Sequence, residues 1–252
     1  MAVKFINFGK NDFFNEKNHH DAIYKYMPSE YALESLDKKY LYFANPKKWD
    51  DPFEKRFIEA KYKTENGITK SFPLEGKVFC TCMTQTPISE AHWIVYGRRK
   101  DVVRITFSRE NLYHILHDFS NRNHCDIYIG KVKYMTTPEI RNGKLSEVLS
   151  YGKCDFKDKK TQIKLLLLKR NAFEYENEIR IIIVYNKKIG KDEVLLDYKP
   201  EFSNELVKKI TLAPKIDNGE KENLRKKFSK YHVEVSESYL YRPKSSNTII
   251  KI

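Results

Sequence analysis

The sequence predicts a single-domain α+β protein built around a mixed or antiparallel sheet. Segments with strand character and segments with helical character follow one another without the strict alternation of a doubly wound fold. The 252 residues carry no visible repeat or low-complexity linker, and the nine glycines and nine prolines do not gather at a boundary. A hydrophobic content of 40% with 32% charged residues is typical of a globular protein with a substantial core.

Short runs of alternating or β-branched apolar residues predict the strands. In chain order they are residues 23–26, 41–44, 78–83, 102–107, 126–134, 179–185, 193–196, 207–213 and 231–235. Pro28 ends the first of them, and a turn-rich loop with Asn45-Pro46 and Asp51-Pro52 follows the second. We expect residues 179–185 and 193–196 to form a hairpin across the lysine- and glycine-containing turn between them.

Helices are expected where apolar residues recur at helical spacing behind a capping residue. They are residues 30–37 behind Ser29, 88–97 ending at Gly97, 109–119 behind Ser108, 156–170 as the longest, and 221–230 behind Asn218. We expect residues 1–20 to be a peripheral N-terminal segment and residues 21–252 to form one domain. No apolar run approaches the length of a membrane span, and the N-terminus lacks a secretory signal pattern, so we expect a cytoplasmic protein.

The formal net charge of +13 favours polyanionic partners such as RNA, DNA and phosphate-bearing ligands. A lysine-rich solvated surface that binds nothing gives the same composition. Cys80, Cys82, Cys125 and Cys154 do not have the spacing of a usual zinc site, so we expect reduced, unpaired thiols and no metal.

The most informative segment is Ala172-Phe173-Glu174-Tyr175-Glu176-Asn177-Glu178-Ile179-Arg180, which leads into a strongly apolar strand. On a strand, Glu176, Glu178 and Arg180 would share one face. Carboxylates at the entrance of a buried strand are costly unless they are paired or used. The segment is therefore either a structural Glu–Arg pair or a catalytic carboxylate held by its neighbours.

Three further segments concentrate aromatic and charged residues. They are Tyr24-Lys25-Tyr26, the segment from Leu41-Tyr42-Phe43 to Asp50-Asp51-Pro52-Phe53-Glu54, and His92-Trp93-Ile94-Val95-Tyr96-Gly97-Arg98. Each has an ordinary alternative: core tyrosines, turn chemistry at the prolines, and a tryptophan buried in the core.

The order of these four motifs resembles a bacterial domain-of-unknown-function family whose members occur near phage-defence and toxin genes. Asp50 stands where that family usually has asparagine, Cys80-Thr81-Cys82 replaces Ser-Phe-Ser, and Trp93-Ile94-Val95-Tyr96 replaces Trp-Ser-His-Tyr. The resemblance covers about residues 22–213.

That family is similar to ADP-ribosyltransferases, which implies a split α+β core sheet, NAD as substrate and a catalytic glutamate on a strand. Carried over to this sequence, the resemblance implies Glu178 as the catalytic glutamate, with Glu176 and Arg180 beside it. The implied NAD-binding residues are Tyr24, Lys25, Tyr42, Trp93, Tyr96 and Arg98, with either Trp93 or Tyr96 stacking on nicotinamide.

These expectations describe an NAD-dependent mono-ADP-ribosyltransferase that acts as a toxin or phage-defence effector. Its acceptor would be nucleic acid, with RNA preferred, or protein. An antitoxin or chaperone protein is a possible partner. Two alternatives stay open. A metal-dependent nuclease would use Asp50, Asp51, Glu54, Glu176, Glu178 and Lys25. A non-enzymatic nucleic-acid-binding module would use only the basic surface.

Overall fold

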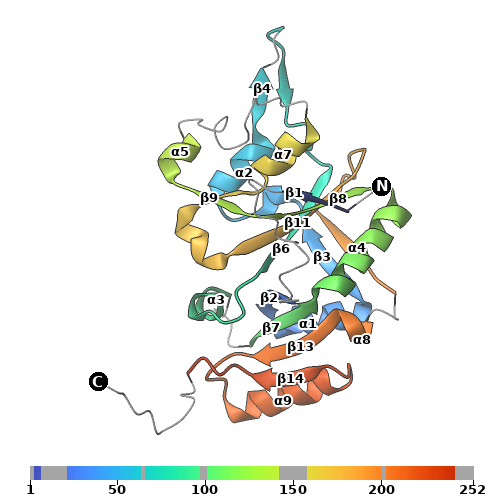
Figure 1. Ribbon diagram of the computed structural model, residues 1–252, viewed down its shortest axis with the longest axis vertical. Helices are drawn as coiled ribbons and strands as arrows, with labels where there is room; N and C mark the ends of the chain where they lie inside the picture. Colours follow the sequence, from blue (N-terminus) through green and yellow to red (C-terminus); the bar gives the residue numbers. More distant parts are fainter. Residues whose placement is uncertain are drawn as a thin grey trace.

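The computed structural model describes residues 3–6, 22–63, 66–96, 101–141, 158–199 and 203–241 (Figure 1). In this part of the chain, ten strands form one mixed sheet. Its main path runs in the order β1 (Val3–Ile6), β8 (Asp126–Lys131), β11 (Glu178–Val184), β6 (Val78–Thr84), β2 (Ala22–Pro28), β7 (Val102–Ser108), β13 (Val207–Leu212) and β14 (Glu234–Glu237). Only the outer pairs β1–β8 and β13–β14 on this path are parallel, so the expected α+β class with a mixed sheet is confirmed.

Two strands off this path complete the ten-stranded sheet, and two further strand pairs of the described chain form separate two-stranded sheets. β3 (Tyr40–Ala44) pairs with both β12 (Glu193–Asp197) and β6. β9 (Lys133–Met135) pairs in parallel with β10 (Leu168–Arg170), and β4 (Lys61–Lys63) pairs with β5 (Thr69–Ser71).

Helices lie on both sides of the sheet (Figure 1). The described helices are α1 (Ser29–Lys38), α2 (Pro52–Glu59), α3 (Glu90–Tyr96), α4 (Arg109–Asn123), α5 (Thr137–Arg141), α7 (Lys159–Leu165), α8 (Ser203–Leu206) and α9 (Asn218–Ser229), with 3₁₀ turns η1 (Pro46–Lys48) and η2 (Asn171–Glu176). None of the described helices combines the length and apolar character that a membrane span needs.

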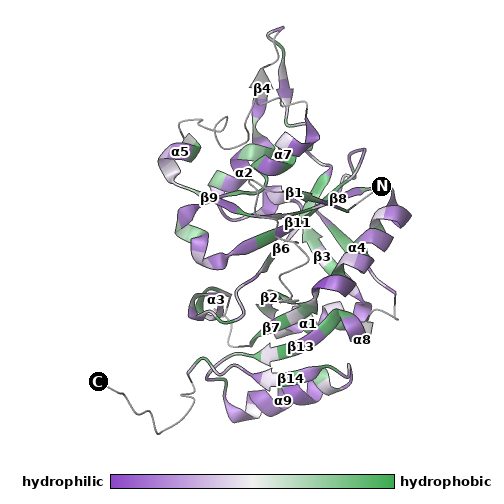
Figure 2. Ribbon diagram, in the orientation of Figure 1, coloured by the Kyte–Doolittle hydropathy of each residue, from purple (hydrophilic) through white to green (hydrophobic). Residues whose placement is uncertain are grey.

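Strand β11 separates the two main cores. Ile179, Ile181 and Ile183 point into the core on the α1 and α4 side, whereas Ile182 and Val184 point into the core on the α2 and α7 side. Because side chains alternate along a strand, Glu178 and Arg180 share the second face. Figure 2 shows the apolar residues gathered on the strands and the hydrophilic ones on the outer helices.

The sheet is split between β2 and β6. β2 pairs with β7 along its whole length, from Ala22 to Pro28, but it meets β6 only at Tyr24 and Thr84. Beyond this point the two strands diverge. This divergence agrees with the split core sheet that the family resemblance implies, and it opens a space beside Glu178.

Several local expectations were wrong. β12 pairs with β3 and not with β11, so no hairpin forms. Of the helix expected over residues 156–170, the described part from residue 158 onward forms α7 over Lys159–Leu165, and Leu168–Arg170 form β10 instead. Ser29 lies inside α1 and bonds to Asp101 without capping the helix. Asn218 likewise lies inside α9, whose N-cap is Asp217.

Two further expectations need correction in part. The N-terminal segment expected to be peripheral includes β1, which pairs with β8 and buries Val3 and Ile6. The loop expected after residue 44 contains α2, which Asp51 caps through the backbone N–H of Phe53.

Candidate active site

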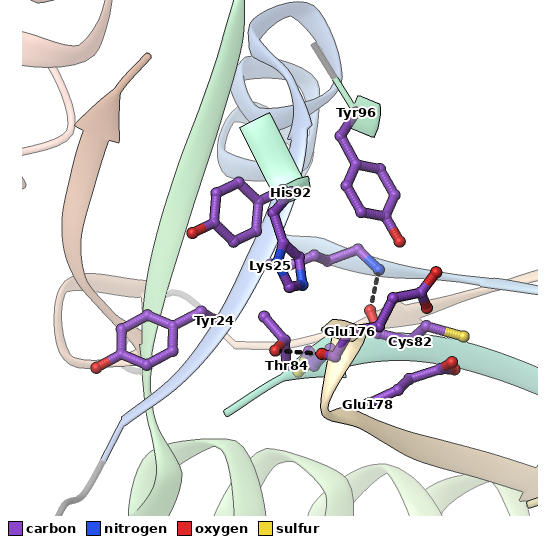
Figure 3. Close-up of a pocket in the computed structure, with 10 residues that line it drawn as sticks. Tyr24, Lys25, Cys82, Thr84, His92, Tyr96, Glu176 and Glu178 are labelled. Atoms are coloured by element: carbon purple, nitrogen blue, oxygen red, sulfur yellow. Dashed lines mark hydrogen bonds between the residues drawn. The ribbon is translucent and has the colours of Figure 1, made fainter. Parts of the chain in front are cut away.

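A small cavity of about 90 Å³ lies where β2 and β6 diverge (Figure 3). β2, β6, α3 and the junction of η2 with β11 each contribute side chains to it. Its lining residues are Tyr24, Lys25, Tyr26, Cys82, Met83, Thr84, His92, Tyr96, Glu176 and Glu178. Typical small-molecule sites measure roughly 300–1,000 Å³. A dinucleotide can therefore place only a small part of itself in this cavity, and the remainder would lie outside it.

Lys25 reaches across the split in the sheet. Its ammonium donates to the Thr81 hydroxyl at 2.9 Å and to the Cys82 carbonyl at 2.7 Å. Where β2 leaves β6, that ammonium takes the place of the backbone donor that a paired strand would supply. Burial lowers the pKa of Lys25, with Cys82 and Glu178 acting in the opposite direction.

Aromatic rings form one wall of the cavity. Tyr26 stacks on His92 with ring centroids 4.8 Å apart, and Tyr96 stacks beyond them at 6.1 Å from His92. His92 is 2% exposed, and its Nδ1 has no hydrogen-bond partner among the described residues. A buried ring nitrogen without a partner is unusual, so this wall can accept a polar ligand atom.

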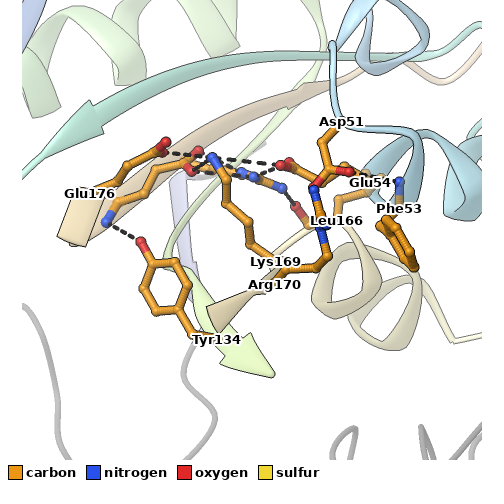
Figure 4. Close-up of polar contacts among 10 residues, drawn as sticks. Asp51, Phe53, Glu54, Tyr134, Leu166, Lys169, Arg170 and Glu176 are labelled. Carbon is orange, nitrogen blue, oxygen red and sulfur yellow. Dashed lines mark hydrogen bonds and ion pairs between the residues drawn. The ribbon is translucent and has the colours of Figure 1, made fainter. Parts of the chain in front are cut away.

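Glu178 and Arg180 form the centre of a buried ionic cluster. Figure 4 shows Lys169 and Glu54 within this cluster. Arg180 is 1% exposed and donates from Nε to Glu178 Oε1 at 2.7 Å. It also donates to the Leu166 carbonyl at 2.6 Å and to Glu54, and it lies 4.3 Å from the Trp49 ring. A fully buried guanidinium is tolerated only with this many partners.

Lys169 joins the carboxylates to one another. Its ammonium lies 2.6 Å from Glu176, 2.9 Å from Glu178 and 3.5 Å from Glu54. β10 carries Lys169, α2 carries Glu54, and β11 carries Glu178, so three separate elements meet at this one ammonium. Sequence reasoning missed Lys169, because the leucine run before it reads as the end of a helix.

Asp51 and Arg170 extend the cluster outward. The Arg170 Nε donates to Asp51 at 3.1 Å, and its guanidinium lies 4.5 Å from the Phe53 ring. The Asp-Pro-Phe-Glu segment thus supplies both a helix cap and two carboxylates of the cluster.

The two carboxylates of the cavity differ in their ionisation. Desolvation opposes ionisation of Glu178, but the charges of Arg180 and Lys169 outweigh it and hold the pKa well below the usual range. Burial raises the pKa of Glu176, with Lys169 opposing the shift. Similarly, burial raises the pKa of Glu54 against the charges of Arg180 and Lys169. Glu178 is therefore an anion at neutral pH, while Glu176 is closer to taking up a proton.

The structure brings together only some of the expected site residues. Glu178, Glu176, Tyr24, Lys25 and Tyr96 line the cavity, and Arg180 lies behind Glu178. Glu176 does not lie on the strand as expected, because it ends η2 and Asn177 takes a left-handed conformation with a φ of 42° before β11 begins. The turn nevertheless returns its carboxylate to within reach of Lys169.

The remaining expected residues lie elsewhere. Trp93 packs edge-on against Tyr26, 4.8 Å between ring centroids, in a separate apolar cluster and does not line the cavity. Tyr42 is 44% exposed on β3 and donates to Glu193, away from the cavity. Arg98 lies outside the described residues.

The carboxylates do not form a metal site in the described part of the chain. No group of three or more histidine, cysteine or acidic side chains there could hold a metal ion. Glu54, Glu176 and Glu178 meet, but Lys169 occupies the point at which they converge. The geometry therefore gives the nuclease alternative no support.

Residues 92–181 match a family model described as a protein of unknown function, DUF2971. The match confirms the resemblance to a domain-of-unknown-function family for the segments that hold Tyr96, Glu176, Glu178 and Arg180. Tyr24, Lys25 and the Asp51–Glu54 segment lie before the matched residues. The search of curated proteins gave no significant match.

Among solved structures, the chain is similar to DarT from Thermus sp. 2.9. The complex with ADP-ribosylated ssDNA has a TM-score of 0.39 at 8% identity, over 86% of this chain and 94% of that chain. The complex with NAD+ has a TM-score of 0.35 at 8% identity, over 87% and 96% of the two chains. TM-scores this low carry no argument for a shared activity.

Proposed function

We propose that this protein is an NAD-consuming mono-ADP-ribosyltransferase with a nucleic-acid acceptor, RNA in preference. The observation that carries the proposal is the cavity itself, in which an ionised and a more readily protonated carboxylate face a wall of stacked aromatic rings. That combination suits a reaction that binds a flat ring, develops positive charge beside it and then removes a proton.

The first step breaks the bond between nicotinamide and ribose, and positive charge develops on the ribose. Glu178 would accept a hydrogen bond from the ribose 2′-hydroxyl and stabilise that charge, most strongly in the transition state. Oε1 of Glu178 already accepts from Arg180 Nε, and Oε2 accepts from Lys169 and, at 3.3 Å, from Arg180 Nη2. The Cys82 thiol also hydrogen-bonds to this carboxylate. Because a carboxylate has about four acceptor positions, the ribose hydroxyl would take the place of the Cys82 thiol or of the long Nη2 contact, while the two cations keep Glu178 oriented.

Glu176 would remove the proton from the acceptor. The nucleophilic atom of the acceptor forms a bond to the ribose carbon that nicotinamide leaves, and the proton it loses passes to the carboxylate. A general base works best when its pKa lies near the working pH. The raised pKa of Glu176 suits this role, and the low pKa of Glu178 does not.

The NAD substrate fits the described residues only in part. The stacked wall of Tyr26, His92 and Tyr96 is suited to the nicotinamide ring, and the unpartnered Nδ1 of His92 is suited to its amide. The adenosine half has to lie outside the cavity, because the volume admits no more than a small ring. The net charge of +13 would draw a polyanionic acceptor to the same surface.

Transfer of labelled ADP-ribose from NAD to bacterial RNA, DNA and protein tests the proposal. We expect label on one fraction with the native protein and a loss on the order of 100-fold or more in Glu178→Gln. Glu193→Gln is the matched control, because Glu193 is an exposed glutamate on β12 outside the cavity. Absence of label and of NAD consumption, with the protein folded, would overturn the proposal.

A further inference from the structure

A row of polar side chains crosses the sheet from the candidate catalytic carboxylate. Register pairs Glu178 with Thr84, Thr84 with Tyr24, Tyr24 with Thr106, and Thr106 with Lys209. Directly paired residues project from the same face of a sheet. At a strand spacing of roughly 4.8 Å, the row extends about 14 Å from β11 to β7. The face that carries Glu178 therefore continues as a polar surface beyond the cavity.

Arg104 lies on this face, two residues before Thr106 on β7. It pairs in register with Tyr26 on one side and Thr211 on the other. Its guanidinium lies 4.9 Å from the Tyr24 ring and donates through Nη2 to the Thr211 hydroxyl at 3.0 Å. Tyr24 lines the cavity, so Arg104 is one side chain away from it.

Arg104 has no carboxylate partner among the described residues. By contrast, the half-buried Arg170 and Arg225 and the buried Arg180 each form ion pairs. Arg104 forms none, and its Nε is buried without a hydrogen-bond partner. Leaving part of a guanidinium desolvated and unpaired is costly, which points to an anion that completes the site.

Thr106 supplies a second, independent sign of a missing ligand. Its side chain belongs to a residue that is only 9% exposed, and its hydroxyl has no hydrogen-bond partner among the described residues. A buried hydroxyl without a partner is uncommon in native proteins. Two unpartnered donors, one charged and one neutral, thus stand two residues apart on one face of one strand.

We propose that Arg104, Thr106 and Thr211 form a phosphate-binding subsite that adjoins the cavity through Tyr24. The planar guanidinium of arginine matches the oxygens of a phosphate group, and hydroxyl groups can supply further hydrogen bonds to it. The phosphate belongs either to the pyrophosphate of NAD or to the backbone of the acceptor strand. This choice of sources rests on the proposed function.

Two binding measurements distinguish these sources: calorimetric titration of ADP-ribose and fluorescence anisotropy of a labelled single-stranded RNA oligonucleotide. We expect Arg104→Gln to weaken one of the two by about tenfold or more, the usual effect of losing a charged hydrogen bond. Loss confined to ADP-ribose assigns the site to the dinucleotide, and loss confined to RNA assigns it to the acceptor. Arg122→Gln removes the same charge from a carboxylate-paired arginine on α4 and is the matched control.

Thr106→Val protects the test against a simple folding defect. Replacing an unpartnered buried hydroxyl by a methyl group of the same shape should leave the thermal midpoint unchanged or raise it, while weakening the same ligand as Arg104→Gln. Unchanged affinities for both ligands in Arg104→Gln and Thr106→Val, relative to Arg122→Gln, would overturn the subsite. Neither binding measurement requires transfer of ADP-ribose. If the variants lose affinity as expected but the native protein transfers no ADP-ribose, the proposed activity is overturned and the phosphate subsite is not.

Discussion

At the scale of single residues, Lys169 determines how much negative charge the site can hold. It is the one ammonium that contacts Glu54, Glu176 and Glu178 among the described residues. Without it, Arg180 would still pair with Glu54 and Glu178, but Glu176 would lose the ammonium that it pairs with. Its position at the end of a leucine run gives no hint of this role in the sequence, because the contact depends on β10 pairing with β9 beside β11.

We expect Lys169→Met to lower the free energy of unfolding by about 3–5 kcal/mol at pH 7, the usual cost of removing one partner from a buried ionic cluster. Glu176 and Glu54 already have raised pKa values, and removing the ammonium would raise them further. A carboxyl group whose pKa is raised in the folded state takes up a proton at a higher pH in the folded state than in the unfolded state, and this uptake stabilises the fold as the pH falls. The loss of unfolding free energy in Lys169→Met should therefore shrink as the pH falls from 7 toward 4.5.

Urea denaturation of the native protein and of Lys169→Met at pH 7 and pH 5 measures this difference. Lys159→Met is the control, since Lys159 pairs with Asp126 at a position where its side chain is 43% exposed. An equal loss at both pH values would contradict the assigned role of Lys169.

Sequence reasoning at the residue scale identified the two cavity carboxylates, Arg180 and the lining residues Tyr24 and Tyr96, but not the counter-charge of Lys169. Glu178 and Arg180 could be predicted as a pair because their spacing on a strand is local. Glu54 joins Arg180 across 126 positions of the chain, and Lys169 joins Glu178 across 9. Only the packing of α2 and β10 against β11 brings these groups together, and no local pattern encodes it.

At the scale of elements, helix α2 depends on Asp51 in two ways. The Asp51 side chain accepts from the Phe53 backbone N–H at 2.9 Å and pairs with Arg170 at 3.1 Å. We expect Asp51→Asn to retain the cap and lose the ion pair, and Asp51→Ala to lose both. Thermal or urea denaturation should find Asp51→Ala less stable than Asp51→Asn by about 1 kcal/mol. Equal stability of the two variants would show that the cap contributes nothing.

Gly130 allows Leu167, which directly precedes β10, to pack against β8. A Cβ at this position would lie 2.4 Å from Leu167 Cδ1 and 3.1 Å from the Ile6 carbonyl. We expect Gly130→Ala to destabilise the fold by about 1–3 kcal/mol through overpacking. In a double-mutant cycle, Leu167→Ala should relieve part of that cost. Strict additivity of the two changes would contradict the predicted contact.

The sequence identified most strands and their approximate ends but misjudged how they pair. Residues 179–185 and 193–196 are close in the chain, so a hairpin is the local expectation, yet β11 is inserted between β6 and β8. β11 carries apolar residues on both faces, and its central position buries both faces. β12, with a mostly exposed face, pairs with the peripheral β3 instead.

At the scale of the whole molecule, the charge of +13 sets how the protein should respond to salt. Binding of a single-stranded RNA oligonucleotide should weaken by at least tenfold between 50 and 200 mM salt, since phosphate contacts release condensed counterions. Fluorescence anisotropy across a salt series measures the slope. An affinity that does not change with salt would contradict electrostatic binding of a polyanion.

The central place of β11 also affects synthesis of the chain. The ribosome completes β6 and β8 well before it reaches Glu178, yet both strands lack a partner on one side until β11 is made. A product truncated before residue 178 would present two unpaired edges, which is a recognised cause of aggregation. The same truncation would lack Glu178 and Arg180, so incomplete chains would be both poorly folded and without the central pair of the site.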